Sequence, residues 1–166
     1  RLQQGRTHAI ATALQADQSG FLALQTQGQL VQQPWAGSPT QLQLPGLDTS
    51  NTTLVAGTLS TTGERAWAIN TQGELMAWTI QRGKATLNFK QTIDMSGLAE
   101  LNRFRPMSAS PTGKNLLLVG TQGLLLLDAN TGKTRCKLEH TEQFYDGMAY
   151  FIDQQTLLSV DMLFTN

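Results

Sequence analysis

The stretch that decides the fold reads NLLLVGTQGLLLLDANTGK and covers residues 115–133. Its leucine runs are apolar enough for a buried helix or part of a membrane span. However, residues 120–123 divide the runs, and residues 130–132 close the second one. Clusters of Gly, Asn and Thr between short apolar runs are typical of turns, and each run has the length of a strand. We therefore predict two antiparallel strands folded about Thr-Gln-Gly at 121–123.

The same turn recurs along the chain. Thr-Gln-Gly ends at Gly28, Gly73 and Gly123, which lie 45 and then 50 residues apart. Each copy has a polar turn and an apolar run before it and a second apolar run after it. The turns read DQSG, STTG and SPTG; the runs before Thr-Gln-Gly read FLALQ, RAWAIN and NLLLVG; the runs after it read QLVQQPW, ELMAWTI and LLLLD.

Further strand-like stretches flank these runs, so each unit is expected to contain four short strands. The stretches before the turns read HAIATALQ (8–15), TTLVAGTLS (52–60) and RFRPMSAS (103–110), and those after the second run read TQLQLPG (40–46), ATLNFKQTI (85–93) and TRCKLEH (134–140). The last two alternate with a period of two, as half-exposed antiparallel strands do.

Four-stranded units of this length are typical of β-propeller blades. We predict an all-β fold: a single partial propeller domain over residues 1–166 with four-stranded antiparallel blades. About three and a half blades are expected, since the blade-like units cover about 7–50, 51–96, 102–141 and, incompletely, 142–166. A β-sandwich with a coincidental repeat is the alternative.

The third unit resembles a WD-repeat blade. In MSASPTGKNLLLVGTQGLLLLDANTGKTRCKLEHT, residues 107–141, Ser-Pro-Thr-Gly at 110–113 is similar to the Ser-Pro-Asp-Gly turn of that family. Residues 130–133 match its second turn, and His140-Thr141 stands where the next blade should open. The repeats also resemble those of quinoprotein-like and bacterial lactonase-like propellers, which share the DANTGK type of turn. The resemblance implies a propeller.

The chain departs from the WD pattern at the positions of its buried polar network. Gln27, Gln72 and Gln122 replace the Asp of the tight turn, and Trp78 alone fills the Trp position. The His–Ser/Thr–Asp–Trp network implied by the resemblance therefore cannot be complete in any blade. A closed propeller needs at least four blades, and seven need over 300 residues at roughly 45 per blade. We expect the remaining blades to lie elsewhere, or a second copy of the chain to supply them.

Charge and composition restrict the partners. Lys plus Arg equals Asp plus Glu at 12 each, so no positive field favours nucleic acid. No apolar run approaches the roughly 18 residues of a spanning helix, so no membrane span is expected. The single Cys136 is predicted to be a small core residue, since free cysteines are mostly buried. The start at Arg1 without Met, the single cysteine and the low charge favour a bacterial periplasmic protein, processed or lipoprotein-derived, over a cytoplasmic one.

Few residues are candidates for a site. Trp35 follows Pro34 near AGSPT and is the best exposed aromatic, whereas Trp67 and Trp78 lie within strand runs and are expected in the core. Loop position also suggests partner-binding roles for Arg103, Arg105 and Tyr145. Structural turn roles are predicted for Gly28, Gly73, Gly123 and His140.

No residue pattern indicates catalysis. There is no Gly-x-Ser-x-Gly elbow, no paired acids of the calcium-loop kind and no Cys/His cluster. We therefore expect no catalytic residue, no cofactor and no metal site in this chain. The sequence favours a non-catalytic protein–protein interaction or scaffold module with a protein partner. The alternative is part of a propeller enzyme, quinoprotein-like dehydrogenase or lactonase-like hydrolase, whose site lies mostly in residues not present here.

Overall fold

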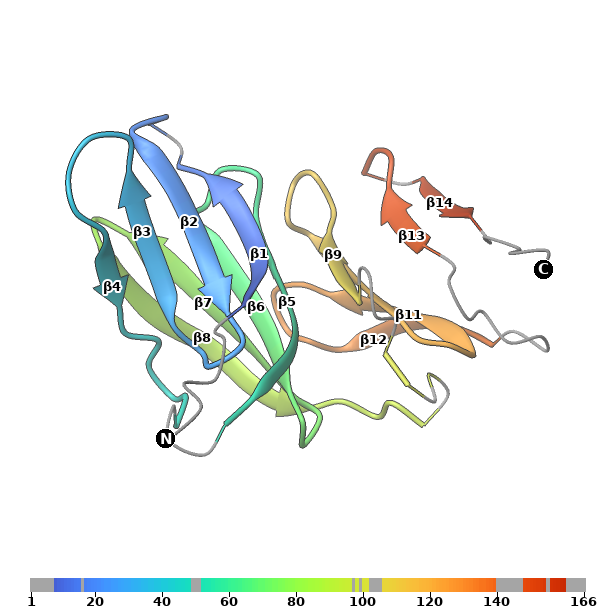
Figure 1. The fold of residues 1–166 in the computed structure, drawn as a ribbon. Helices are drawn as coiled ribbons and strands as arrows, with labels where there is room; N and C mark the ends of the chain where they lie inside the picture. Colours follow the sequence, from blue (N-terminus) through green and yellow to red (C-terminus); the bar gives the residue numbers. More distant parts are fainter. Residues whose placement is uncertain are drawn as a thin grey trace, which may run out of the picture.

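The computed structural model describes residues 8–15, 17–48, 52–96, 98, 100–101, 106–139, 148–154 and 156–160. These residues form three four-stranded sheets and one two-stranded sheet, all antiparallel (Figure 1). Sheet 1 contains β1 (Ala9–Leu14), β2 (Gly20–Gln25), β3 (Leu30–Pro34) and β4 (Thr40–Leu42); sheet 2 contains β5 (Leu54–Leu59), β6 (Arg65–Asn70), β7 (Glu74–Gln81) and β8 (Lys84–Thr92). Sheet 3 contains β9 (Met107–Ala109), β10 (Asn115–Val119), β11 (Gly123–Asp128) and β12 (Thr134–Glu139); sheet 4 contains β13 (Met148–Phe151) and β14 (Leu157–Val160).

The sheets follow one another as the blades of a propeller do. Within each sheet the strands lie in sequence order, and the first strands of neighbouring sheets contact one another: β1 with β5, β5 with β9, and β9 with β13. These first strands therefore form the inner side of an arc. The predicted fold class is confirmed: the chain is an all-β partial propeller with four-stranded antiparallel blades. No helix long and apolar enough to cross a membrane occurs in the part of the chain that the structure describes.

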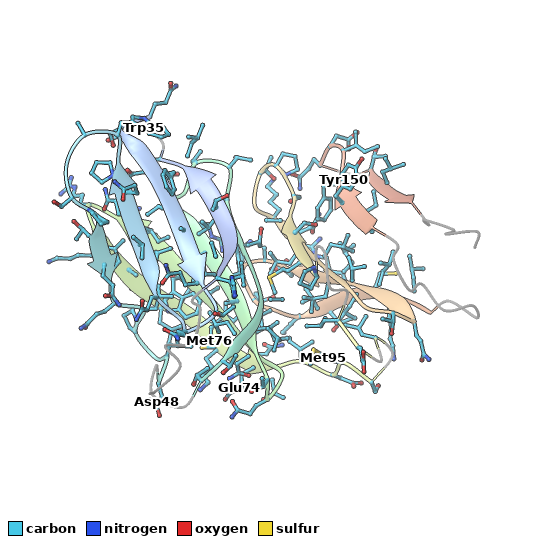
Figure 2. All side chains as sticks on the ribbon, in the orientation of Figure 1. Trp35, Asp48, Glu74, Met76, Met95 and Tyr150 are labelled. Atoms are coloured by element: carbon cyan, nitrogen blue, oxygen red, sulfur yellow. The ribbon has the colours of Figure 1, made fainter. Side chains whose placement is uncertain are left out.

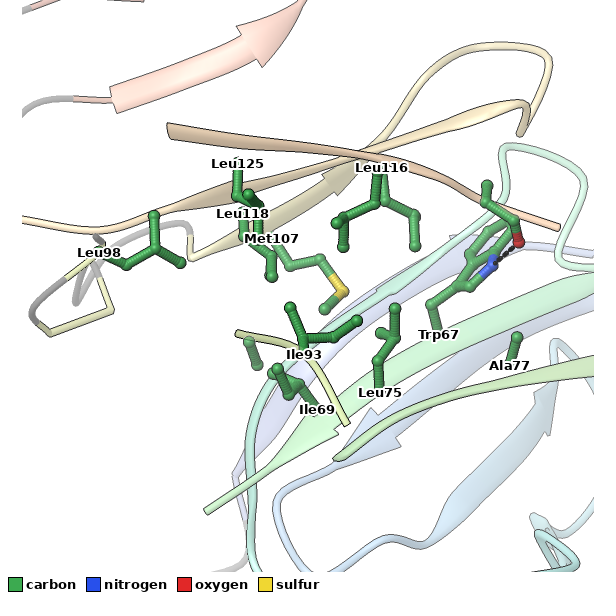
Figure 3. Packing of buried hydrophobic residues seen from close by; sticks show 13 residues of the cluster. Trp67, Ile69, Leu75, Ala77, Ile93, Leu98, Met107, Leu116, Leu118 and Leu125 are labelled. Atoms are coloured by element: carbon green, nitrogen blue, oxygen red, sulfur yellow. Dashed lines mark hydrogen bonds between the residues drawn. The ribbon is translucent and has the colours of Figure 1, made fainter. Parts of the chain in front are cut away.

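Hydrophobic clusters fill the spaces between successive sheets. Sheet 2 is apolar on both faces. Trp67, Ile69 and Leu75 face sheet 3 (Figure 3). On the other face, Met76 and Trp78 pack against sheet 1. The largest cluster includes Trp67, Ile69, Leu75, Ala77, Ile93, Leu98, Met107, Leu116, Leu118, Leu125 and Leu127. Stacking on both faces explains why the leucine runs of the third unit do not alternate with polar residues. Both Trp67 and Trp78 are fully buried, as predicted.

The Thr-Gln-Gly turns differ in length. In sheets 1 and 2 they are three-residue loops in which Gly28 and Gly73 adopt φ values of 75° and 76°, a conformation that glycine adopts readily. In sheet 3 the N–H of Gly120 donates to the carbonyl of Gly123 at 2.9 Å, so the loop has only two residues and Gly123 is the first residue of β11. This loss of one residue turns the following side chains to the opposite face of the sheet. Leu125 consequently packs towards sheet 2.

Polar contacts join the turns of sheets 2 and 3. Arg65 Nη1 donates to the carbonyl of Gly113 at 3.0 Å and to Asn130 Oδ1 at 2.9 Å, and Nη2 donates to the carbonyl of Ala129 at 3.0 Å. The guanidinium lies over the ring of Trp67, 4.6 Å from its centroid. Burial lowers the pKa of Arg65, while the charge of Asp128 raises it. One arginine thus links two blades through three backbone or turn acceptors.

The sequence expectation for Cys136 is wrong. Cys136 is exposed on β12, the outermost strand of sheet 3, and pairs with Leu126 of β11. Its side chain shares the face of Leu126, over which the two strands of sheet 4 do not extend far enough to bury it. The exposure of Cys136 therefore follows from the lack of a covering strand over this part of β12 among the described residues.

The turn between β11 and β12 is expected to lose stability in acid, because it contains Asp128, whose pKa is lowered in the folded chain. Its hydrogen bond with the Arg135 guanidinium, followed by the backbone N–H groups of Asn130 and Thr131, lowers its pKa from 3.8 to about 2. A depressed pKa adds stability that is present above pH 3.8 and is lost as the pH falls towards about 2. We expect Asp128→Asn to have a lower melting temperature than the wild type at neutral pH. Between pH 3.8 and about 2, the melting temperature of the variant should fall less than that of the wild type. Circular dichroism melts from pH 2 to 7 measure this, and equal losses in both proteins would contradict it.

Candidate partner-binding face

Trp35 lies at the end of β3 with 64% of its surface exposed (Figure 2). Its Nε1–H donates to the carbonyl of Gln18 at 2.7 Å, and its backbone N–H donates to the carbonyl of Ser19 at 3.0 Å. Its ring meets the ring of Phe21 at 5.9 Å between centroids and a 48° tilt. The indole is thus held in place by one hydrogen bond and a ring contact, and the backbone of Trp35 by a second hydrogen bond. The outer side of the ring faces solvent, as the sequence predicted.

The counterpart of Trp35 in sheet 2 is buried. The bond from the Trp35 N–H to Ser19 is repeated 45 residues further along, where the N–H of Ile80 donates to the carbonyl of Glu64 at 2.7 Å. Ile80 is only 8% exposed, because sheet 1 covers it. The exposure of Trp35 therefore results from the absence of a covering sheet among the described residues and does not come from the strand itself.

Other side chains of sheet 1 share this face. Strand pairing places Leu14 opposite Phe21, and Phe21 opposite Gln33. We define the outer face of sheet 1 by the residues Leu14, Phe21, Val31, Gln33 and Trp35. Their counterparts in sheet 2, each 45 residues further along, are Leu59, Ala66, Met76, Trp78 and Ile80, all buried in one cluster. Leu14, by contrast, is 55% exposed.

Sequence reasoning found Trp35 but missed Leu14 and Phe21. The 45-residue spacing of the first two units contained the necessary signal, since it aligns Leu14 with Leu59 and Phe21 with Ala66. The other predicted site residues do not lie on this face of sheet 1, or they fall outside the residues that the structure describes. Gly28 and Gly73 form turns, Gly123 begins β11, and Arg103, Arg105, Tyr145 and His140 lie outside the described residues.

A groove of about 610 Å³ runs along the inner strands β1 and β5 to the start of β9. Thr12, Thr58 and Ser60 line it with hydroxyl groups, and Leu59 and Met107 line it with apolar surface. The described residues of its lining carry no titratable side chain, and no cluster of three or more His, Cys, Asp or Glu suited to a metal occurs in the described ranges. These residues offer hydrogen bonding and apolar contact, without a general acid or base.

Comparison with known proteins identifies a fold. No protein-family model and no curated protein sequence matches the chain. Many solved structures resemble it, among them the three that follow. The β-propeller domain of Myceliophteria thermophila Cps50 (Swd1) matches with a TM-score of 0.57 and 13% identity over 82% of this chain and 45% of that one. A putative 6-phosphogluconolactonase from Bacteroides uniformis matches with a TM-score of 0.60 and 16% identity, over 95% and 48%. The C-terminal WD40 domain of Sif2 matches with a TM-score of 0.58 and 13% identity, over 91% and 42%.

These likenesses show that the chain has the β-propeller fold found both in WD40 domains and in lactonase-like propellers. The chain spans less than half the length of each of the three structures. The resemblance to propeller repeats expected from the sequence is therefore confirmed at the level of the fold.

Proposed function

We propose that this chain is a protein-binding scaffold module whose partner docks on the outer face of sheet 1. The observation that supports this most directly is Trp35, whose exposed indole is held by the hydrogen bond from Nε1 to the Gln18 carbonyl and by the ring of Phe21. Rigid aromatic side chains are the commonest energetic centres of protein interfaces, because they bury a large area at a small entropic cost. WD40 propellers among the similar structures favour the same class of function.

The chemistry of the face indicates the kind of partner. Leu14, Phe21 and Trp35 form an apolar ridge, and Gln33 beside it offers an amide that donates and accepts hydrogen bonds. No ionisable side chain belongs to the residues that define this face. The partner should therefore present an apolar surface with neutral polar groups around it. The corresponding face of sheet 2 is covered by such a surface, the apolar residues of sheet 1.

Affinity capture followed by calorimetry tests the proposal. Proteins retained by the immobilised chain are identified by mass spectrometry, purified, and titrated against wild-type chain and Trp35→Ala. Loss of an interface centre of this kind costs about 2 kcal/mol or more, so we expect affinity to fall about thirtyfold. Ile152→Ala is the matched control, since Ile152 is also exposed, at 56%, but lies in the turn directly after β13.

Equal affinities for wild type and Trp35→Ala would reject the outer face of sheet 1 as the binding surface. The enzyme alternative is tested on the same preparation with lactone substrates and with quinone-dependent oxidation of alcohols. Turnover that survives purification and is unaffected by Trp35→Ala would favour a propeller enzyme over a scaffold.

A further inference from the structure

A groove of about 660 Å³ lies between sheets 1 and 2, where the β1–β2, β5–β6 and β7–β8 turns come together. Its lining mixes apolar and neutral polar side chains: Leu22, Ile80, Gln32, Thr62 and Gln81. Charged side chains from the turns line it as well. Both walls belong to four-stranded sheets of the described chain, so two complete blades form the groove.

The equivalent place between sheets 2 and 3 is occupied by the guanidinium of Arg65. This residue begins β6, and its guanidinium donates to the carbonyls of Gly113 and Ala129 and to Asn130 Oδ1. The ring of Trp67, two residues further along β6, lies beneath it. The chain therefore shows in one of its own blade interfaces that a guanidinium fits between turns of this kind.

The turn glycines of the two interfaces are equivalent. Gly63 and Gly113 adopt φ values of 71° and 64°. A Cβ at Gly63 would lie 3.0 Å from the Leu22 side chain, and a Cβ at Gly113 would lie 3.3 Å from the Trp67 ring. Each turn thus packs against the same position in the second strand of the preceding sheet. The Gly63 carbonyl corresponds to the Gly113 carbonyl that accepts from Arg65.

The other two acceptors of sheet 3 also have counterparts in sheet 2. The N–H of Ile80 donates to the carbonyl of Glu64 at 2.7 Å, and the N–H of Ala129 makes the equivalent bond in sheet 3 at 3.0 Å. Ile80 therefore corresponds to Ala129, and the next residue, Gln81, stands where sheet 3 has Asn130. Both Ile80 and Gln81 line the groove.

Sheet 1 lacks the side chain that would fill this groove. The residue equivalent to Arg65 is Gly20, the first residue of β2, which pairs with Pro34 as Arg65 pairs with Thr79. Residues 8–48 contain no Lys or Arg. The space that a guanidinium fills between sheets 2 and 3 is therefore left open between sheets 1 and 2.

The charges around the groove favour a cation. Asp17 and Glu64 line it with carboxylates and Arg82 lines it with a guanidinium, so one negative charge is in excess. The hydroxyl and the backbone N–H of Ser19 donate to Asp17 and lower its pKa, so this carboxylate is ionised at neutral pH. Such a balance attracts cations and disfavours phosphate or carboxylate ligands.

We propose that the groove between sheets 1 and 2 binds the guanidinium group of an arginine side chain. The guanidinium donates to the carbonyls of Gly63 and Ile80 and to the side-chain oxygen of Gln81, as Arg65 does to the equivalent groups of sheet 3. The carboxylates of Asp17 and Glu64 offset its charge. Lysine is a poorer ligand, because an ammonium lacks the planar fork that reaches several acceptors at once.

Titration of the isotope-labelled intact chain with N-acetyl-arginine methylamide tests the proposal by nuclear magnetic resonance. We expect saturable shifts of the backbone amides of Gly63 and Gln81. The matching lysine and citrulline compounds should bind more weakly, since one lacks the fork and the other lacks the charge. A pentapeptide with one central arginine among glycine and alanine identifies the source: tighter binding of the peptide assigns the arginine to a polypeptide, and equal binding assigns it to a small molecule.

Glu64→Lys should weaken binding about tenfold, because it turns an attraction into a repulsion at an exposed position. Sheet 3 carries Lys114 at the equivalent turn position, so the substitution suits the turn. The reverse change, Lys114→Glu, is the matched control and should leave the affinity unchanged. Circular dichroism checks that both variants fold, and Glu64→Gln should weaken binding in the same direction if Glu64→Lys does not.

Equal affinities for the arginine and lysine compounds, or an unchanged affinity in Glu64→Lys, would overturn the inference. Arg65→Ala opens the groove between sheets 2 and 3, and the arginine compound should then shift the amide of Gly113 as well. Shifts at Gly113 in that variant without shifts at Gly63 would also overturn it. The site lies on the face of sheet 1 opposite the outer face, so this test does not depend on the proposed function.

Discussion

Trp67→Ala is expected to lower the free energy of unfolding by about 3–5 kcal/mol. The indole is fully buried between sheets 2 and 3, and its truncation leaves a cavity that rigid strands on both sides cannot close. The change also removes the hydrogen bond from Nε1 to the carbonyl of Ala129, 2.8 Å away, and the ring beneath the Arg65 guanidinium. Packing and a hydrogen bond between two blades are lost (Figure 3), together with a cation–π contact within β6.

Urea unfolding followed by far-ultraviolet circular dichroism measures this loss without relying on tryptophan emission. Trp35→Ala is the matched control, because the same atoms are removed from a largely exposed side chain. Its cost should be about 1 kcal/mol, because the exposed indole loses one hydrogen bond and one ring contact but leaves no buried cavity. Similar midpoints for the two variants would show that sheets 2 and 3 do not share the packed interface described above.

Repetition made the strands predictable. The run RAWAIN coincides with β6, and the other runs differ from their strands by only a few residues, because a polar turn fixes each end. The stretch TQLQLPG shows the largest difference, since β4 covers only Thr40–Leu42. In RFRPMSAS, residues 103–105 lie outside the described residues, and β9 covers Met107–Ala109. Pro106 stands immediately before it and lacks the N–H that a strand interior needs.

Register in the third unit could not be predicted. The motif Thr-Gln-Gly aligns Leu125 with Leu75, yet Leu75 faces sheet 3 and Leu125 faces sheet 2. A run of four leucines is equally apolar on both faces, so its hydrophobic pattern does not distinguish two registers one residue apart. The two-residue loop closed by Gly120 and Gly123 decides between them, and that choice is a property of the turn geometry.

The candidate site was predictable in one residue only. Pro34 and the small polar loop after Trp35 indicated exposure correctly, whereas Leu14 and Phe21 looked like ordinary strand residues. Their exposure depends on which sheets cover which faces, and the same long-range property misled the expectation for Cys136. Local sequence patterns therefore predict the strands well. They do not predict which face of a sheet another sheet buries.

Gly20→Ala is expected to destabilise the chain and to displace Trp35. A methyl group at Gly20 would lie 2.1 Å from the carbonyl oxygen of Gln33 and 2.7 Å from Cα of Pro34, so the backbone of β3 would have to move. Gly20 is the first residue of β2 and pairs with Pro34, directly beside the turn whose Gln18 carbonyl accepts from the indole. Forcing extra atoms into a packed site costs about 1–3 kcal/mol, and the cost is higher when backbone must shift.

The indole N–H resonance of Trp35 reports the displacement, since its bond to the Gln18 carbonyl sets its chemical shift. The resonance is assigned by its disappearance in Trp35→Ala. In Gly20→Ala it should move towards the position of a solvated indole, together with a lower urea midpoint. Gly83→Asn is the control: a Cβ there meets nothing within 4 Å, and asparagine tolerates the φ of +73°. An unchanged Trp35 resonance in Gly20→Ala would show that the indole is positioned independently of the β2–β3 contact, and the close approach at Gly20 would then serve strand pairing alone.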